Sequence, residues 1–193
     1  MLGILFKEDM FLQIVRGNKC QTRRIIKSVD PSFMFIGKGA EDYTTFEHPG
    51  TREVYGVYPK YRTHKVYYVK EPYAEVPVLD HYEFTIYQYD HKEPHEYHPD
   101  LFEKKIKWRP KIFMPGRKAR YFLRIENIRV QGLTEISDED VLQEGFDSVE
   151  QMEERWDQIN GPGSFWSNPW VFAYTFTLLT GEELDENLLS GLR

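Results

Sequence analysis

The chain has 193 residues, of which 40% are hydrophobic and 16% aromatic, enough for one domain with a substantial core. Cys20 is the single cysteine, which excludes a disulfide-stapled secreted scaffold, and the net charge of -6 argues weakly against a nucleic-acid partner. No apolar run approaches the roughly 20 residues of a membrane span, and residues 1–6 lack the basic start of a signal peptide. We therefore expect a cytoplasmic protein with no membrane partner.

Hydrophobic periodicity and turn signals predict many short strands and few helices. In chain order we expect a strand at 2–6, a helix at 8–16, strands at 22–26, 54–58, 65–70, 81–89 and 119–130, helices at 137–145 and 148–158 capped by Ser137 and Ser148, and a strand at 170–177. In the strand at 119–130, Leu123 and Ile125 have one parity and Ile128 and Val130 the other, which predicts a bulge. This pattern favours an α+β fold, a small β-barrel with a few packed helices.

Residues 17–24 gather an amine, a hydroxyl and two guanidinium groups at a turn that leaves a helix and enters a strand. Along an extended strand Thr22 and Arg24 point to one face and Arg23 to the other. Lys19 lies three residues before Thr22, and a neutral lysine can deprotonate such a hydroxyl in a nucleophilic site. The alternative is a basic strand edge that only contacts solvent.

Glu71 ends a strand whose other residues are largely apolar. A carboxylate in that place is suited to general acid–base chemistry, or to neutralising Lys19 or Arg24. It is equally suited to a structural ion pair. We therefore treat Lys19, Thr22 and Glu71 as the candidate catalytic residues.

Charge is distributed unevenly along the chain. Residues 101–130 carry ten basic and two acidic side chains, whereas residues 131–193 carry two basic and fourteen acidic ones. A basic stripe can bind phosphates within an acidic protein, since fields act over about 8–10 Å in physiological salt. Alternatively, the basic and acidic segments pair with each other. The candidate nucleic-acid-binding residues are Arg23, Arg24, Trp108, Arg109, Arg117, Lys118 and Arg120.

A histidine cluster has the spacing of metal ligands, with His91, His95 and His98 close in sequence. Pro94 and Pro99 interrupt any helix there, so ligands would have to converge from a loop. We therefore expect no metal and no cofactor.

The string Gly17-x-Lys19-x-x-Thr22-x-Arg24 resembles the G-x-K-x-x-T-x-R signature of the ASCH family, within the PUA-like superfamily. Further stretches are similar, in the same order, to a subgroup common in phage and prophage genomes. These are residues 21–24, 68–71, 109–110 with 114–115, the helix at 137–146, and 156–161 followed by 168–171. The resemblance covers nearly the whole chain and implies a single domain over 1–193, with insertions near 30–64 and 75–105.

The resemblance implies a PUA-like β-barrel with a cleft beside the signature, and RNA or a nucleotide as partner. Some small members resemble amidohydrolases that deacylate N4-acylated cytidine, such as N4-acetylcytidine. Their catalytic lysine and threonine match Lys19 and Thr22, and their glutamate corresponds in position to Glu71. This chain is nearly twice as long as those hydrolases, and Phe113 stands where the subgroup often has histidine. We expect nucleic-acid or nucleotide binding, with the hydrolase as the alternative.

Overall fold

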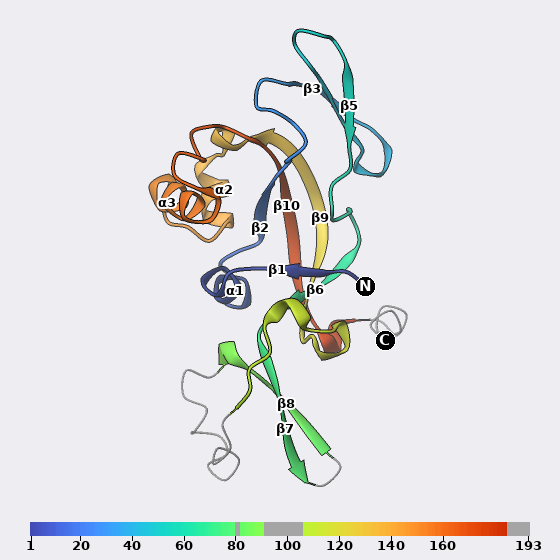
Figure 1. Ribbon diagram of the computed structural model, residues 1–193, viewed down its shortest axis with the longest axis vertical. Coiled ribbons are helices and arrows are strands. Elements are labelled where there is room, and N and C mark those ends of the chain that lie inside the picture. The colour runs from blue at the N-terminus through green and yellow to red at the C-terminus, as the bar shows by residue number, and fades with distance from the viewer. Residues whose placement is uncertain (80–81, 91–105, 185–193) are drawn as a thin grey trace. The chain divides into compact units, whose positions relative to one another are not determined.

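A computed structural model describes residues 1–79, 82–90 and 106–184 (Figure 1). The chain divides into two compact units. The first, unit 1, comprises Met1–Leu12, Val66–Leu123 and Leu179–Arg193, and the second, unit 2, comprises Gln13–Lys65 and Arg124–Leu178. The expected single domain stays a prediction.

In the described part of the chain, the main sheet has five strands in the order β1-β6-β9-β10-β2, with β1 and β2 at its two edges. Their bounds are β1 Gly3–Leu5, β2 Gln21–Ile25, β6 Val66–Lys70, β9 Tyr121–Gly132 and β10 Trp170–Thr180. β1 pairs with β6 in parallel, and β2 pairs with β10 in antiparallel register. β9 and β10 are long enough to contribute residues to both units. All five strands coincide with predicted ones to within a few residues.

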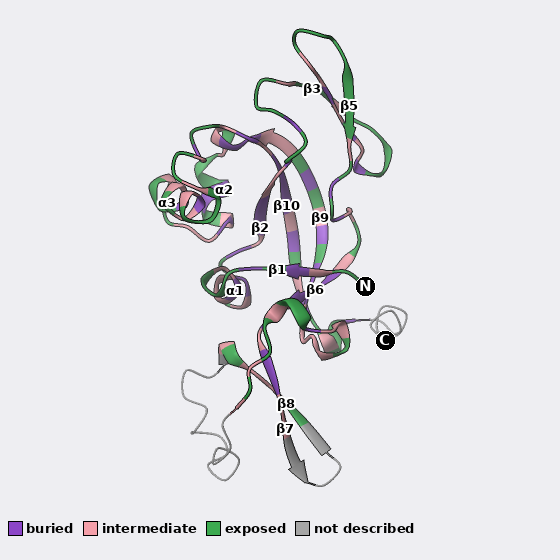
Figure 2. Cartoon of the chain, in the orientation of Figure 1, coloured by how far each residue is buried: buried purple, intermediate pink, exposed green. Residues whose placement is uncertain are grey.

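The burial of β9 changes parity along its length, as its sequence predicts. Leu123 and Ile125 have no exposed surface, and Ile128 is 2% exposed although it has the opposite parity. Buried residues also run along β10, from Val171 to Tyr174 (Figure 2). These strands supply apolar side chains to the cores of the units to which they belong.

Unit 1 adds a hairpin of β7, Tyr73–Leu79, and β8, Tyr82–Tyr87. β8 was predicted, whereas β7 was not, because Pro77 within a run argues against a strand. The register of the hairpin shifts between Pro77 and Leu79, which accommodates a residue that has no N–H to donate. A small core in this unit gathers Tyr68, Phe122, Leu179 and Leu184.

Unit 2 adds a three-stranded antiparallel sheet of β3 Met34–Lys38, β4 Thr44–Glu47 and β5 Val54–Val57, in that order. The strand predicted at 54–58 is present as β5 and pairs with β4, but β3 and β4 were missed because glycines and prolines break up the segment in which they lie. Each of the two segments outside the family resemblance, near 30–64 and 75–105, thus contributes strands of a small separate sheet.

Three α-helices occur in the described part of the chain: α1 Glu8–Val15, α2 Asp138–Gln143 and α3 Val149–Asn160. As predicted, Ser137 and Ser148 cap the second and third, each accepting a hydrogen bond from the backbone N–H three residues on. α2 and α3 cover a core that includes Leu133, Val141 and Trp156. The fold is therefore α+β, and none of the helices that the structure describes is long and apolar enough to cross a bilayer.

Candidate functional site

The signature strand β2 presents different chemistry on its two faces. It pairs with β10 so that Thr22 lies opposite Tyr174 and Arg24 opposite Phe172. Side chains alternate along a strand, so Gln21 and Arg23 share the other face. Both of these side chains contact Asp140 on α2. Arg23 therefore lies on the face opposite to Thr22 and Arg24, as predicted.

Helix α2 supplies the acidic half of the site. Asp140 and Glu144 are four residues apart, at the start and the C-terminal end of α2, and therefore lie on one side of it. The Ser137 hydroxyl caps the helix by accepting from the Asp140 N–H at 3.2 Å. A short, firmly capped helix thus fixes two carboxylates against β2. Both are buried, with Asp140 5% and Glu144 4% exposed.

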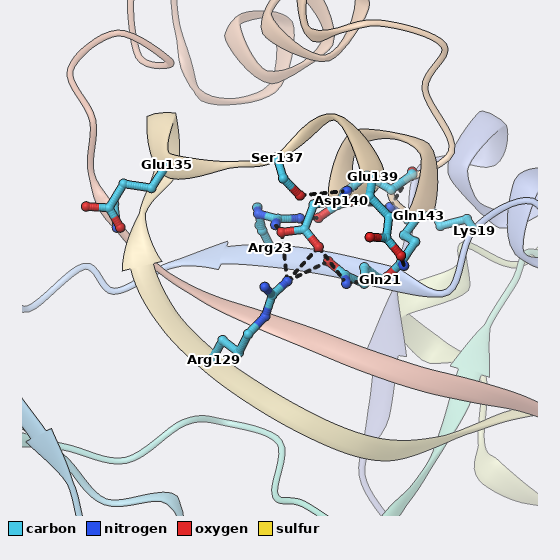
Figure 3. A network of polar contacts seen from close by, with 11 residues as sticks. Lys19, Gln21, Arg23, Arg129, Glu135, Ser137, Glu139, Asp140 and Gln143 are labelled. Carbon is cyan, nitrogen blue, oxygen red and sulfur yellow. Dashed lines mark hydrogen bonds and ion pairs between the residues drawn. The ribbon is translucent and has the colours of Figure 1, made fainter.

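Asp140 is the centre of a network of polar contacts (Figure 3). It accepts hydrogen bonds from Arg23 Nη2 at 2.7 Å, from Arg129 Nη2 at 2.7 and 2.8 Å, and from Gln21 Nε2 at 2.9 Å. Gln21 also accepts from both guanidinium groups through its side-chain carbonyl, at 3.2 Å from Arg23 and 3.3 Å from Arg129. The glutamine therefore bridges two cations that would otherwise repel each other.

Glu144 holds the signature lysine. Lys19 Nζ donates to the Glu144 carboxylate and, at 2.7 Å, to the Glu144 backbone carbonyl, while Arg23 Nη1 donates to the same carboxylate at 2.9 Å. Gly145 makes this approach possible. Its φ of +86° favours glycine, and a Cβ there would lie 3.2 Å from the Cβ of Lys19.

The electrostatics of the network are unevenly balanced. Burial lowers the pKa of Lys19, and the carboxylate of Glu144 opposes part of that shift. Burial would raise the pKa of Asp140, but hydrogen bonds from Arg129 and Gln21 and the charge of Arg23 bring it below its ordinary value. Lys19, Arg23 and Arg129 face two carboxylates, so the cluster carries one excess positive charge.

Glu71 and Arg120 form a second ion pair, in unit 1, of which only Glu71 is fully buried. Glu71 has no exposed surface and accepts from Arg120 Nε at 2.8 Å and Nη2 at 2.7 Å, a bidentate geometry. The guanidinium also stacks on Tyr87 and Tyr121, with its carbon 4.1 and 4.9 Å from the ring centroids. Arg120, predicted as a phosphate contact, is thus the counter-charge of Glu71, predicted as a catalytic residue.

The basic segment, residues 106–120, lies in unit 1 and contains six basic and no acidic side chains. Arg109 and Lys118 both form ion pairs with Glu75, with N···O distances of 2.9 Å for Arg109 and 2.5 Å for Lys118. The side chain of Arg109 nevertheless remains 55% exposed, and Arg117 is exposed. Phe113, at 71% exposure, has the most exposed large hydrophobic side chain in the described chain.

The structure brings the predicted residues together in two groups. Lys19 and Arg23 meet in unit 2, and Glu71 and Arg120 meet in unit 1. Thr22 is buried in β2 of unit 2, and Arg24 follows it on the same strand, half-buried. Trp108 is half-buried in the basic segment. The convergence of Lys19, Thr22, Arg24 and Glu71 on one concave site stays a prediction.

Asp140, Glu144, Gln21 and Arg129 were missed as site residues. A usable signal was present, since both carboxylates fall within the stretch at 137–146 that resembles the family helix. The histidine cluster at 91–98 lies outside the described residues. Among those that are described, no group of three potential metal ligands occurs.

Comparisons with known proteins add no family assignment. No family model matches the chain, and neither the curated proteins nor the solved structures give a significant match. The functional argument therefore depends on the chemistry of the residues themselves.

Proposed function

We propose that this chain is an ASCH-type domain with a PUA-like barrel. We further propose that it binds nucleic acid, with RNA as the favoured partner, through its basic segment. The observation that carries the proposal is the exposed cationic and aromatic surface of residues 106–120. Arg109 and Arg117 offer guanidinium groups to phosphates, and Phe113 offers a ring face to a base. This combination is what single-stranded nucleic acid requires.

The signature network is better suited to a structural role than to catalysis. Burial lowers the pKa of Lys19, but the two Glu144 oxygens that hold its ammonium group oppose this shift and so work against the neutral amine that a general base needs. Arg23 has no exposed side-chain surface, so any phosphate contact there would require its pairs with Asp140 and Glu144 to open. We assign Lys19 and Arg23 a structural role that fixes β2.

The test is RNA binding as a function of salt. Fluorescence anisotropy of a labelled single-stranded oligonucleotide should show affinity falling with salt, with a log–log slope of roughly -0.7 per contacted phosphate. Arg117→Gln should weaken binding severalfold and reduce that slope, and Phe113→Ala should weaken binding about tenfold through lost stacking.

Two matched control variants test whether a loss of RNA binding is specific to the basic segment. Arg124→Gln removes an exposed arginine of unit 2, and Phe84→Ala removes a 53%-exposed phenylalanine of β8. Both should bind RNA within about twofold of the unmodified chain, because neither lies in the basic segment. Binding that ignores salt, or equal losses in test and control variants, would refute the proposal.

A second candidate is the amidohydrolase acting on an N4-acylated cytidine, with Thr22 as nucleophile, Lys19 as base and Glu71 relaying protons. The observation in its favour is that burial lowers the pKa of Lys19, which makes the neutral amine easier to form. Thr22→Ala should then abolish release of acetate from N4-acetylcytidine while the nucleoside still binds. If the unmodified chain does not hydrolyse N4-acetylcytidine, this second candidate function is excluded.

A further inference from the structure

Unit 2 contains a pocket that neither the signature nor the basic segment includes. It has a volume of about 690 Å³ and lies between the connection from β3 to β4, residues 62–65 and Asn127 on β9. Binding pockets for small molecules usually measure roughly 300–1,000 Å³, so one nucleotide fits. Its walls belong largely to the insertion near 30–64.

The inner wall of the pocket is firmly built around Asp42, which is 8% exposed. Its carboxylate accepts from the Thr63 N–H at 2.9 Å, from the Thr63 hydroxyl at 2.7 Å and from Lys38 Nζ at 2.7 Å. Lys38 also donates to the Ile128 carbonyl at 3.0 Å. The Thr63 hydroxyl also lies 2.7 Å from the second carboxylate oxygen, so four contacts already use the roughly four acceptor positions of this carboxylate, and a ligand N–H or O–H would share an oxygen with one of them.

Backbone strain is concentrated in the same walls. Glu41, Asp42 and His64 all have positive φ, at 53°, 64° and 60°, a conformation that residues with a side chain adopt rarely. Such conformations persist only where the surroundings hold them, and they cluster at binding sites. His64 and Lys65 are both exposed and both line the pocket.

An aromatic face adjoins these charges. The guanidinium carbon of Arg62, a lining residue, lies 4.3 Å from the ring centroid of Tyr58, and that tyrosine is 54% exposed. The ring of Tyr43 packs on that of Tyr58, with 4.7 Å between centroids and 47° between the ring planes. The pocket therefore combines an acceptor inside, cations at the rim and a supported aromatic ring beside them.

We propose that this pocket binds one nucleotide of a single-stranded RNA. The base packs against the exposed part of Tyr58, beside Arg62 and Tyr43, and donates a hydrogen bond toward Asp42, while the phosphate meets Lys65 and His64 at the rim. A bare phosphate does not suit the interior, because the Asp42 carboxylate would repel it. The site is separate from the basic segment and does not depend on the function proposed for that segment.

The test is binding of a labelled single-stranded RNA of about ten nucleotides to the full chain, measured by anisotropy across salt concentrations. Tyr58→Ala should weaken binding about tenfold through lost stacking. Lys65→Gln should weaken it severalfold and reduce the salt slope by roughly 0.7. The matched control is Lys60→Gln, an exposed lysine of the same segment that does not line the pocket, and it should bind within about twofold of the unmodified chain.

The outcomes separate the two proposals. If Tyr58→Ala and Lys65→Gln bind RNA as Lys60→Gln does, while Arg117→Gln weakens binding, the pocket proposal is overturned and the basic segment stands. If only the pocket variants lose affinity, the pocket stands and the basic segment falls. An unmodified chain that binds no single-stranded RNA overturns both, and urea unfolding of each variant identifies any loss of affinity that comes from misfolding.

Discussion

The buried network of unit 2 and the basic segment of unit 1 use the same residue types under opposite conditions. The side chains of Lys19 and Arg23 are 2% and 0% exposed and are held by carboxylates, whereas that of Arg109 is 55% exposed. A charge removed from water must be compensated by a partner, but an exposed charge can exchange water for a ligand phosphate. Burial therefore distinguishes the cations that hold this fold from those available to a ligand.

Glu144→Ala should give the largest effect, because it leaves Lys19 and Arg23 buried with reduced compensation. We expect the free energy of unfolding to fall by about 3–5 kcal/mol, measured by urea denaturation. The control is Glu139→Ala on the same helix, where the side chain is exposed and a loss under about 0.5 kcal/mol is expected. Equal losses in both variants would mean that the buried contacts of Glu144 contribute no more to the free energy of unfolding than the exposed side chain of Glu139 does.

Glu71→Gln should give a smaller loss, about 2–3 kcal/mol, although Glu71 is fully buried. Its partner Arg120 is 26% exposed, so the freed guanidinium can recover part of its hydration. Glu75→Gln, whose side chain is 16% exposed, is the comparison within the same unit, and it should lose less. A greater loss for Glu75→Gln in urea denaturation would contradict this ranking.

Acid should weaken the unit 2 network through Asp140, whose pKa lies below its ordinary value of 3.8. A carboxyl group with a lowered pKa in the folded state stabilises the fold above its unfolded pKa, and that contribution is lost as pH falls through the folded pKa. At neutral pH, Asp140→Asn should cost about 1–3 kcal/mol. This difference from the unmodified chain should shrink below about pH 4 and disappear in stronger acid. A difference that stays constant with pH would show that the charge of Asp140 is not what stabilises the network.

Arg117→Gln should give the smallest effect on stability and the clearest effect on binding. The side chain is exposed in the basic segment, so its urea midpoint should match that of the unmodified chain while RNA affinity falls severalfold. The comparison between the two regions would fail if this variant unfolded as easily as Glu144→Ala.

Local patterns were sufficient to predict most elements. Alternation and β-branched content located β6 and β10, and the serines at 137 and 148 located the starts of α2 and α3. β3 and β7 were missed because their sequences contain glycine or proline, and β4 because it has only four residues; all three are stabilised by pairing with a neighbouring strand. Strand pairing of that kind depends on residues distant in sequence.

The sequence by itself determined which residues were candidates, since the signature, Glu71 and the basic segment all stand out by type and spacing. It also left open whether residues 17–24 form a basic strand edge that only contacts solvent, and the tertiary structure instead buries Lys19 and Arg23 against Glu144 and Asp140. Glu144 lies 125 residues from Lys19 along the chain, and only the packing of α2 on β2 brings the two charges together. Spacing reports which residues share a face of one element, whereas burial and ion pairing depend on what packs against that face.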